Sequence, residues 1–446
     1  MLAAGLLLYG WLWRGGPGWG GDTPSYLDAA RDLVDFRWDR LHLRVPGYPL
    51  FLRVVAGPGA PGYRLVLAQL ALYAVAVWSL ASLLAGSGVA RAGVLAFVTA
   101  CWLPHVVQAA GTALSESLTQ SLLMLGFAAL ARAVFLDGKR LALVGASVAF
   151  GYLAVTRPVY QATAPTLAAL LGLVVLMGSA GPSRARLLRA AAVLPIGTIV
   201  LAGSLAFYQQ SRFGAPASPA AAIALAAQTA AYVEALPAEE PLRQILVRHR
   251  DAHLAVARHH RPEGYIFRAW PELVAHFDGD ERRTTREVTR LSRLVIRREP
   301  RAYLLQVWRS FARYWEWISF AVPGLRAPGI VAPLLLVHFT TAAIFWALLG
   351  SFVVVGAWVA VLPQSVRGRW RVAEPTASEL GTFALAAAAV LLHMLLQCAL
   401  GVGEPRYRLP SEPLVILAVT VAISFLCRAR RGLTAGPGAE PVDRPS

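Results

Sequence analysis

The chain alternates long apolar runs with shorter polar connections, and most of the runs are long enough to cross a lipid bilayer. A hydrocarbon core of about 30 Å needs about 20 mostly apolar residues in a helix. Such runs recur at 2–13, 63–85, 89–110, 114–136, 141–156, 160–178, 188–207, 328–361, 379–400 and 411–427. The pattern predicts an all-α polytopic membrane protein with about ten transmembrane helices.

The first run is short, because Arg14 follows only about a dozen apolar residues, which is also the length of a signal-peptide core. A signal peptide begins with basic residues, which are missing here, and Trp11, Trp13 and Trp19 are typical of a membrane interface. We interpret the run as a span, and we expect its shortness to reflect a start codon placed too late.

Composition agrees with a membrane protein, since 57% of the residues are hydrophobic and only 15% are charged. The formal net charge of +17 does not indicate nucleic acid, because Lys139 is the only lysine and the arginines are spread over many loops. Cys101, Cys398 and Cys427 lie inside apolar runs, so they predict neither a disulfide framework nor a metal site.

Charge also predicts the topology, because short loops rich in Lys and Arg lie on the cytoplasmic side. The basic short loops follow even-numbered runs, at Arg91, 137–140, 183–189, 366–371 and 428–431. Both termini are therefore expected in the cytoplasm. The extracytoplasmic face then receives 14–62, the turns near 111–114 and 156–161, the long segment 208–326, and 401–412.

Four regions follow from this pattern. We expect an N-terminal membrane domain at 1–207 with about seven spans and its first outer loop at 14–62, a helical cap at 208–326, a C-terminal membrane domain at 327–431 with about three spans, and a disordered tail at 432–446. Within the cap, 239–260 and 281–300 repeat apolar residues at helical spacing, and an aromatic-rich amphipathic helix follows Pro300. That helix is suited either to packing between cap and membrane domain or to the interface.

His249 and His253 in the cap have the four-residue spacing of a zinc-binding pair. Arginines flank them, and the glutamate of a zinc protease is missing beside His249. A solvated basic face is the favoured interpretation, and it includes His259 and His260.

Charged side chains close to membrane depth are costly unless they are paired or used. The first outer loop places Asp22, Tyr26, Asp28, His42 and Arg44 within one short stretch. A carboxylate and an arginine at a membrane surface indicate a site. The alternative is a plain connector whose helix is capped by Asp22 or by the threonine after it.

Three further elements share the outer face. Glu116 is either a site carboxylate or a first-turn residue favoured by the helix dipole. Arg157 is suited to phosphate, with snorkelling to lipid headgroups as the alternative. Before the last run, Arg406, Tyr407 and Arg408 form a stiff cationic turn that is suited to an anionic headgroup, unless it is ordinary loop charge.

Several familiar motifs are missing from the sequence: a P-loop, a dinucleotide-binding glycine motif, GxSxG, HExxH and CxxC. Nucleotide-driven transport, serine hydrolysis and thiol chemistry therefore lack their usual signatures. Carboxylates and arginines are the chemical groups that remain.

The order of these motifs resembles the GT-C superfamily of polyprenyl-phosphate-sugar-dependent glycosyltransferases. The resemblance rests on GDTPSYLDAARDL, RVPGYPLFL, LSESL, TRP and EPRYRLPSEPLVILA, and it covers about 5–205 and 330–427. Within the superfamily, the bacterial protein mannosyltransferase and aminoarabinose transferase branch is the most similar.

The resemblance implies a hexosyl or pentosyl transferase of the bacterial inner membrane. Its donor would be a polyprenyl-phosphate sugar, its acceptor a hydroxyl of a lipid, glycan or protein on the periplasmic face, and its reaction inverting. By the resemblance Asp22 takes the place of the first-loop catalytic carboxylate, and Arg44, Arg157, Arg406 and Arg408 are candidates for binding the lipid phosphate. From the residues themselves we expect Asp22 to be the general base, with Asp28 and Glu116 as alternatives. We also expect four residues of the same polar elements to contribute to substrate binding: Tyr26, Asp28, Glu116 and Tyr407. Family members often carry an Asp-Glu pair where Thr23 follows Asp22 here, so no cofactor is implied and a divalent metal stays open.

Other functions fit parts of the same pattern. An O-antigen ligase or polymerase would transfer a whole glycan from a pyrophosphate carrier. A transporter or flippase of lipid-linked sugars would place polar groups at mid-membrane in repeated halves, and no repeat is visible. A noncatalytic scaffold is the last alternative. Four polar residues inside the runs are expected to be interhelical hydrogen-bond partners: Gln69, His338, His393 and Gln397.

Overall fold

The computed structural model describes residues 1–35, 44–57, 59–136, 138–176, 184–213, 219–256, 264–316, 328–361, 377–400 and 405–434. Throughout these ranges the regular structure is helical, with one isolated β-bridge between Gly18 and Thr112. The predicted all-α polytopic architecture is confirmed.

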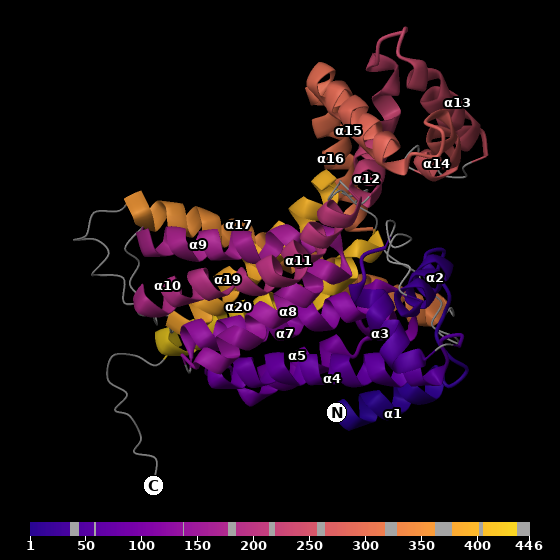
Figure 1. Cartoon of the computed structure of the whole chain (residues 1–446). Coiled ribbons are helices and arrows are strands. Elements are labelled where there is room, and N and C mark those ends of the chain that lie inside the picture. Colours follow the sequence, from indigo (N-terminus) through magenta and orange to yellow (C-terminus); the bar gives the residue numbers. More distant parts are fainter. Residues whose placement is uncertain are drawn as a thin grey trace.

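In the described ranges, seven helical segments are long and apolar enough to cross a membrane. They are built from α4 (Tyr63–Gly86), α7 (Ser115–Phe135), η3 (Pro158–Ala162) with α9 (Thr163–Leu176), α10 (Arg184–Val193) with α11 (Ile196–Phe213), α17 (Pro328–Val361), α19 (Ala377–Leu400), and η6 (Pro405–Ser411) with α20 (Glu412–Thr434). Figure 1 shows these helices running side by side as one bundle. The bundle is the scaffold that presents the polar connections at its ends.

Three of the ten predicted spans differ from straight, full-length helices. The run at 89–110 is a broken span, in which α5 (Arg91–Cys101) is bent by 59° from α6 (Pro104–Val107) and the following η2 (Gln108–Gly111). Pro104 lacks the backbone N–H that a continuous helix would need at the break. The other two are shorter helices, α1 (Leu2–Leu12) and α8 (Arg140–Thr156).

The segment 14–62, predicted as the first outer loop, contains two helices, α2 (Thr23–Val34) and α3 (Gly47–Ala56). His42 lies outside the described residues. Tyr26 of α2 and Tyr48 and Leu52 of α3 pack into one buried cluster with Leu118 of α7. This cluster fixes both helices to the N-terminal end of α7.

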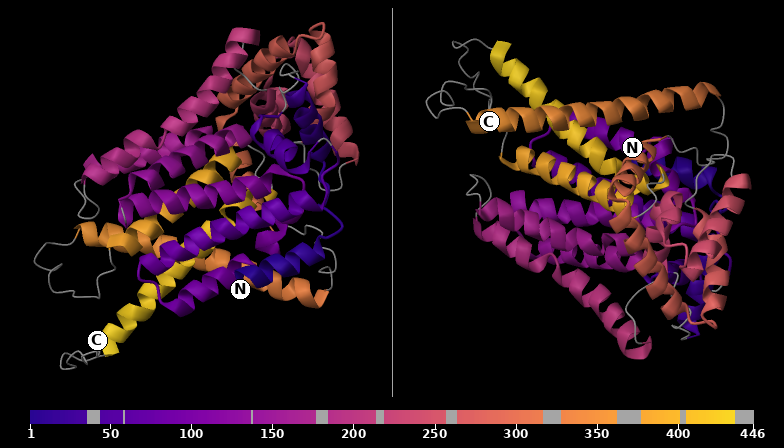
Figure 2. Two further views of the ribbon diagram at one scale, coloured as in Figure 1. Left: turned by 60° about the horizontal axis from the view of Figure 1, so that its bottom comes forward. Right: turned by 90° about the horizontal axis from the view of Figure 1, so that it is seen from above.

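The cap has its own hydrophobic core. It consists of α12 (Pro219–Thr229), η4 (Ala230–Ala235), α13 (Pro241–Val256), α14 (Tyr265–His276), α15 (Glu281–Arg298) and α16 (Pro300–Tyr314). Ile223, Leu246, Ile266, Leu273 and Leu291 are among its buried residues. In Figures 1 and 2 these helices project from the bundle toward the end that carries α2.

The helices predicted inside the cap are confirmed as α13 and α15. His249 is partly buried and bonds to the carboxylate of Glu272 at 2.8 Å. His259 and His260 lie outside the described residues, and so does the tail predicted from 432 except for its first three residues, 432–434, where α20 ends.

The close contact of α8 with α11 depends on two glycines. A Cβ atom at Gly197 would lie 2.0 Å from the carbonyl oxygen of Ser147, and one at Gly151 would lie 2.5 Å from the backbone of Gly197. The Ser147 hydroxyl accepts the Gly197 N–H at 2.8 Å. Small residues of this kind let membrane helices pack backbone to backbone.

Replacing Gly197 by alanine is therefore expected to separate the two helices. We expect a loss of about 1–3 kcal/mol of stability, which thermal unfolding of the purified protein in detergent would show as a lower Tm. Gly203→Ala in the same helix is the matched control, since a Cβ atom there would meet nothing within 4 Å. Equal Tm values for the two variants would contradict the predicted close contact.

Candidate functional site

Asp22 stands at the start of α2, but its side chain does not cap that helix. Its neighbours make other contacts at this end: the Gly20 N–H donates to the hydroxyl of Thr23, and Ser25 donates to the backbone carbonyl of Asp22. The Asp22 carboxylate instead accepts a hydrogen bond from Arg44 at 2.7 Å and forms an ion pair with Arg406 at 3.2 Å. The alternative that the Asp22 carboxylate serves only as a helix cap is therefore wrong.

A second carboxylate joins the same cluster from α7. Glu116 is buried, and one of its oxygens lies 3.5 Å from Arg157 and 4.0 Å from Arg406. The Arg157 Nη1 makes no hydrogen bond within the described part of the chain, although Glu116 is within ion-pair distance. Arg406 links the two carboxylates, so Asp22 and Glu116 share one site.

Two tyrosine rings hold the guanidinium groups in place. Arg44 lies over the ring of Tyr26 at 4.5 Å, while Arg157 and Arg406 lie over the ring of Tyr407 at 4.6 and 5.1 Å. Cation–π contacts of this kind orient an arginine through its flat face and leave its N–H groups at the edge. Arg44 and Arg406 use these groups on Ser25, Asp22 and the Tyr407 hydroxyl, so an anion would have to compete with the existing partners.

The tyrosines are themselves fixed by hydrogen bonds. The Tyr26 hydroxyl bonds to Ser115 at 2.9 Å, which ties α2 to the start of α7. The backbone carbonyl of Tyr407 accepts from His393 at 2.6 Å, and the other nitrogen of that ring bonds to the Tyr160 hydroxyl at 2.7 Å. His393 of α19 therefore holds Tyr407, and with it the ring under Arg157 and Arg406, in position.

The charges of this cluster are nearly balanced. Arg44, Arg157 and Arg406 face Asp22 and Glu116, so the cluster carries one positive charge in excess. Burial raises the pKa of the Asp22 carboxyl, but Arg44 and Arg406 lower it by more, so its pKa lies below the ordinary value. Asp22 is consequently ionised at neutral pH and only weakly basic while both arginines hold it.

Two of the predicted site residues lie elsewhere. Asp28 is exposed and pairs with Arg31, one turn further along α2, at 3.2 Å. It makes no contact with the cluster around Asp22 within the described part of the chain. Arg408 is buried and bonds to Glu412 at 2.8 Å, and it also donates to the backbone carbonyls of Tyr314 and Glu316. Arg406 and Arg408 are only two residues apart in η6, but their side chains point in different directions. Arg406 contacts Asp22, whereas Arg408 contacts Glu412.

Arg408 belongs to a second buried cluster with Glu412, His338 and His105. The ligand atoms of the two histidines and the glutamate lie within 4.8 Å of one another, which resembles a metal-binding group. The guanidinium of Arg408 already occupies one oxygen of Glu412, and a divalent cation beside it would be repelled. We interpret this cluster as a structural ion pair that joins η6 and α20 to the end of α16.

Sequence reasoning did not identify Ser25 and Ser115, which bond to Arg44 and Tyr26. Their only signal is proximity to Asp22 and Glu116. Three of the four polar residues expected to be interhelical partners form side-chain hydrogen bonds. Gln69 donates to backbone carbonyls at 2.9 Å, His338 bonds to Glu412 at 3.3 Å, and His393 bonds to Tyr407 as described above. Gln397 contributes to the hydrogen bonding of Tyr160.

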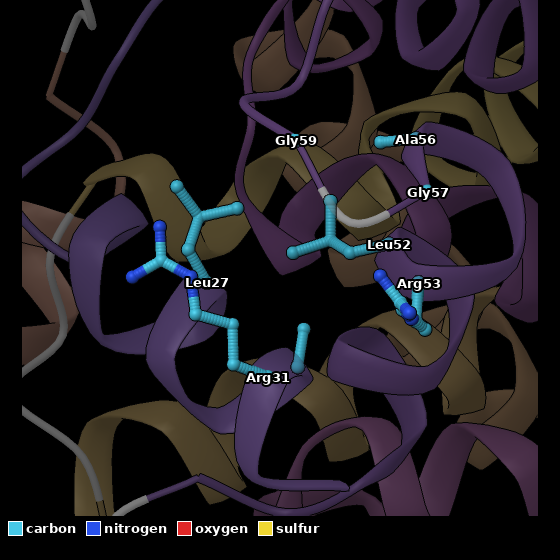
Figure 3. A pocket seen from close by; sticks show the side chains of 8 residues that line it. Leu27, Arg31, Leu52, Arg53, Ala56, Gly57 and Gly59 are labelled. Atoms are coloured by element: carbon cyan, nitrogen blue, oxygen red, sulfur yellow. The ribbon is translucent and has the colours of Figure 1, made fainter. Parts of the chain in front are cut away.

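A small pocket lies between α2 and α3 (Figure 3). Leu27 and Leu52 line it, and the side chains of Arg31 and Arg53 flank it. Its volume of about 10 Å³ holds no more than one water molecule. A sugar therefore needs a different opening.

Comparison with known proteins gives little. No family model matches the chain, and no curated protein does. Among solved structures, the chain is similar to the archaeal oligosaccharyltransferase AglB from Archaeoglobus fulgidus, determined in complex with an inhibitory peptide and a dolichol-phosphate. The likeness has 12% identity and a TM-score of 0.47, and it covers 100% of this chain and 52% of that one. The chain thus spans about half the length of that protein, and a likeness at this level assigns neither a family nor an activity.

Proposed function

We propose that the chain is an inverting glycosyltransferase of GT-C type, which moves a sugar from a polyprenyl-phosphate donor to an acceptor hydroxyl on the extracytoplasmic face. The single observation that carries this proposal is the cluster of Asp22, Glu116, Arg44, Arg157 and Arg406 at one end of a membrane bundle. It combines a carboxylate that can take a proton with arginines that can bind a phosphate.

The net charge of the cluster favours a monophosphate donor. A sugar linked to polyprenyl phosphate is a phosphodiester with one negative charge, which neutralises the excess positive charge of the three arginines and two carboxylates. A pyrophosphate carrier brings two negative charges and would leave one of them uncompensated in a partly buried site. The charge balance therefore favours a monophosphate donor over the ligase or polymerase alternative.

Binding of the phosphate would also activate Asp22. The phosphate oxygens compete for Arg44 and Arg406, and as these arginines turn toward the phosphate the pKa of Asp22 rises. The carboxylate then takes the proton of the acceptor hydroxyl while the acceptor oxygen bonds to the anomeric carbon. The bond from that carbon to the phosphate oxygen breaks, and polyprenyl phosphate leaves with the electron pair, held by the arginines. Attack opposite the leaving group inverts the anomeric carbon.

The cluster does not fit a divalent metal. Hard cations bind to carboxylate, carbonyl and water oxygens, whereas both oxygens of Asp22 are engaged by Arg44 and Arg406. Three guanidinium groups around two carboxylates repel a further cation. In the proposed reaction the arginines alone stabilise the negative charge of the leaving phosphate.

The pH dependence of kcat/KM should report the pKa of Asp22, which the neighbouring arginines lower. Because the pKa of Asp22 is lowered, activity should persist as the pH falls through the ordinary carboxyl range, and it should be lost only below it. Arg406→Gln removes one cause of the lowering, so the acid limb should move to higher pH. Arg31→Gln is the control, since Arg31 pairs with the exposed Asp28. An unshifted acid limb in Arg406→Gln would contradict the assignment of Asp22 as the titrating base.

The size of the product tests the proposed reaction. The chain would be expressed in a host that supplies lipid-linked sugars, and the envelope glycans would be compared by mass spectrometry with those of a host without it. One added sugar per acceptor is expected. Addition of a whole glycan chain would instead support a ligase or polymerase, and unmodified acceptors with relocated lipid-linked sugar would support a flippase.

A further inference from the structure

The cap carries a row of arginines that the site does not use. Arg286, Arg290, Arg293 and Arg297 are spaced four, three and four residues apart along α15, so they share one helical face. All four are exposed. The opposite face of the same helix, with Val288 and other buried residues, packs into the core of the cap.

Most of this row lacks a balancing charge. Arg290 pairs with Glu240 at 3.0 Å and with Glu287 at 2.7 Å. Arg286, Arg293 and Arg297 form no ion pair with any residue in the described ranges. The helix as a whole has seven arginines and two glutamates.

The row borders an open groove of about 420 Å³, lined also by Thr285, Thr289 and Leu294. From the first to the last arginine of the row the helix advances by about 16 Å, at 1.5 Å per residue. A single phosphate is too small to neutralise a row of this length, so the face fits several anionic groups at once.

The next helix indicates what those groups are. α16 begins at Pro300, directly after α15, and it exposes Leu304, Leu305 and Trp308 with 65%, 46% and 62% of their surface accessible. The Tyr303 hydroxyl donates to the backbone carbonyl of Ala399 at 2.7 Å, at the end of the span formed by α19. The first turn of α16 therefore lies beside the C-terminal end of that candidate span.

We propose that the arginine face of α15 and the exposed apolar side chains of α16 bind the membrane surface, with the arginines on anionic phospholipid headgroups. Exposed Leu and Trp side chains beside the end of a span are typical of a helix in the interface. A row of arginines in the adjoining helix supplies the attraction to anionic lipid, and phosphate is the group that guanidinium binds best. A soluble polyanion would match the arginines but would leave the apolar side chains of α16 without a partner. The contact holds the cap against the bilayer, and it does not depend on the proposed transferase activity.

The test uses the full chain in lipid nanodiscs, with a fluorescent label at position 289 (Thr289→Cys) in the groove. Cys427→Ser removes the exposed cysteine, and Cys101 and Cys398 are buried. Nanodiscs of phosphatidylcholine, with or without phosphatidylglycerol, would carry a nitroxide quencher on the lipid headgroup. We expect stronger quenching with phosphatidylglycerol, and we expect added salt to weaken it.

Paired variants separate this face from general charge. Each arginine near an anionic surface strengthens binding by about fivefold, so Arg293→Gln with Arg297→Gln should weaken the lipid contact by an order of magnitude or more. Arg248→Gln with Arg268→Gln removes the same charge from α13 and α14 and should leave quenching unchanged. Equal quenching with and without phosphatidylglycerol, or equal losses in the two paired variants, would overturn the proposal. So would a label response to dextran sulfate in neutral nanodiscs without a response to phosphatidylglycerol, which would assign the face to a soluble polymer.

Discussion

Asp22→Asn is expected to lower kcat for sugar transfer by about 10²- to 10⁴-fold, the usual contribution of a positioned general base. Asparagine keeps the shape of the side chain but cannot accept the acceptor proton. The substitution also raises the net positive charge around Arg44 and Arg406, so affinity for the anionic donor should be kept or increased. The loss should therefore appear in kcat and not as a higher KM.

Asp28→Asn is the matched control, because it makes the same change six residues further along the same helix. Asp28 is exposed and, within the described part of the chain, pairs only with Arg31, so this variant should transfer sugar at nearly the normal rate. Loss of transfer in Asp28→Asn with retention in Asp22→Asn would move the base to Asp28. Both rates would be measured on monodisperse protein.

The second large effect is expected on stability, at Arg408. Both Arg408 and its partner Glu412 are buried, with 2% and 3% of their surface accessible. Removing one partner of a buried ion pair leaves an uncompensated charge and costs about 3–5 kcal/mol. Arg408→Gln and Glu412→Gln should each lower the Tm strongly. Loss of Arg408 also frees the carbonyls of Tyr314 and Glu316, so the end of α16 should become more accessible to hydrogen exchange.

Two comparisons make this expectation specific. Arg406→Gln, two residues away, removes a partly exposed guanidinium from the cluster around Asp22 and should impair transfer while leaving the Tm almost unchanged. Replacing both members of the buried pair by apolar residues, as Arg408→Met with Glu412→Leu, should recover much of the lost stability. Strong destabilisation by Arg406→Gln and not by Arg408→Gln would show that the roles of the two arginines have been exchanged.

The sequence was sufficient for the fold class because apolar runs of membrane length need few further assumptions. The hydropathy pattern was less informative where the backbone bends inside an apolar run. Pro104 divides a run that looks continuous in composition, and the bend of 59° follows from a backbone donor that hydropathy does not weigh. The sequence predicts a span at the short helix α8. It does not show the close contact of α8 with α11, which depends on Gly151 and Gly197.

The candidate site was predictable in part. Charge counting places the segments of Asp22, Glu116, Arg157 and Arg406 on one face, and the structure brings these four residues together. Sequence cannot show which carboxylate of α2 points inward, because that depends on the helix rotation fixed by the buried Tyr26. It also cannot separate Arg406 from Arg408, since a single turn of η6 turns one guanidinium toward Asp22 and the other toward Glu412.

Transfer from a defined donor tests the central claim most directly. Purified protein would be incubated with an envelope extract as acceptor and with sugars linked to polyprenyl phosphate or to polyprenyl pyrophosphate, and free polyprenyl phosphate and pyrophosphate would be measured. The account predicts release of polyprenyl phosphate from at least one monophosphate-linked sugar, with the release lost in Asp22→Asn. Release from pyrophosphate-linked donors alone, or undiminished release by Asp22→Asn, would contradict it.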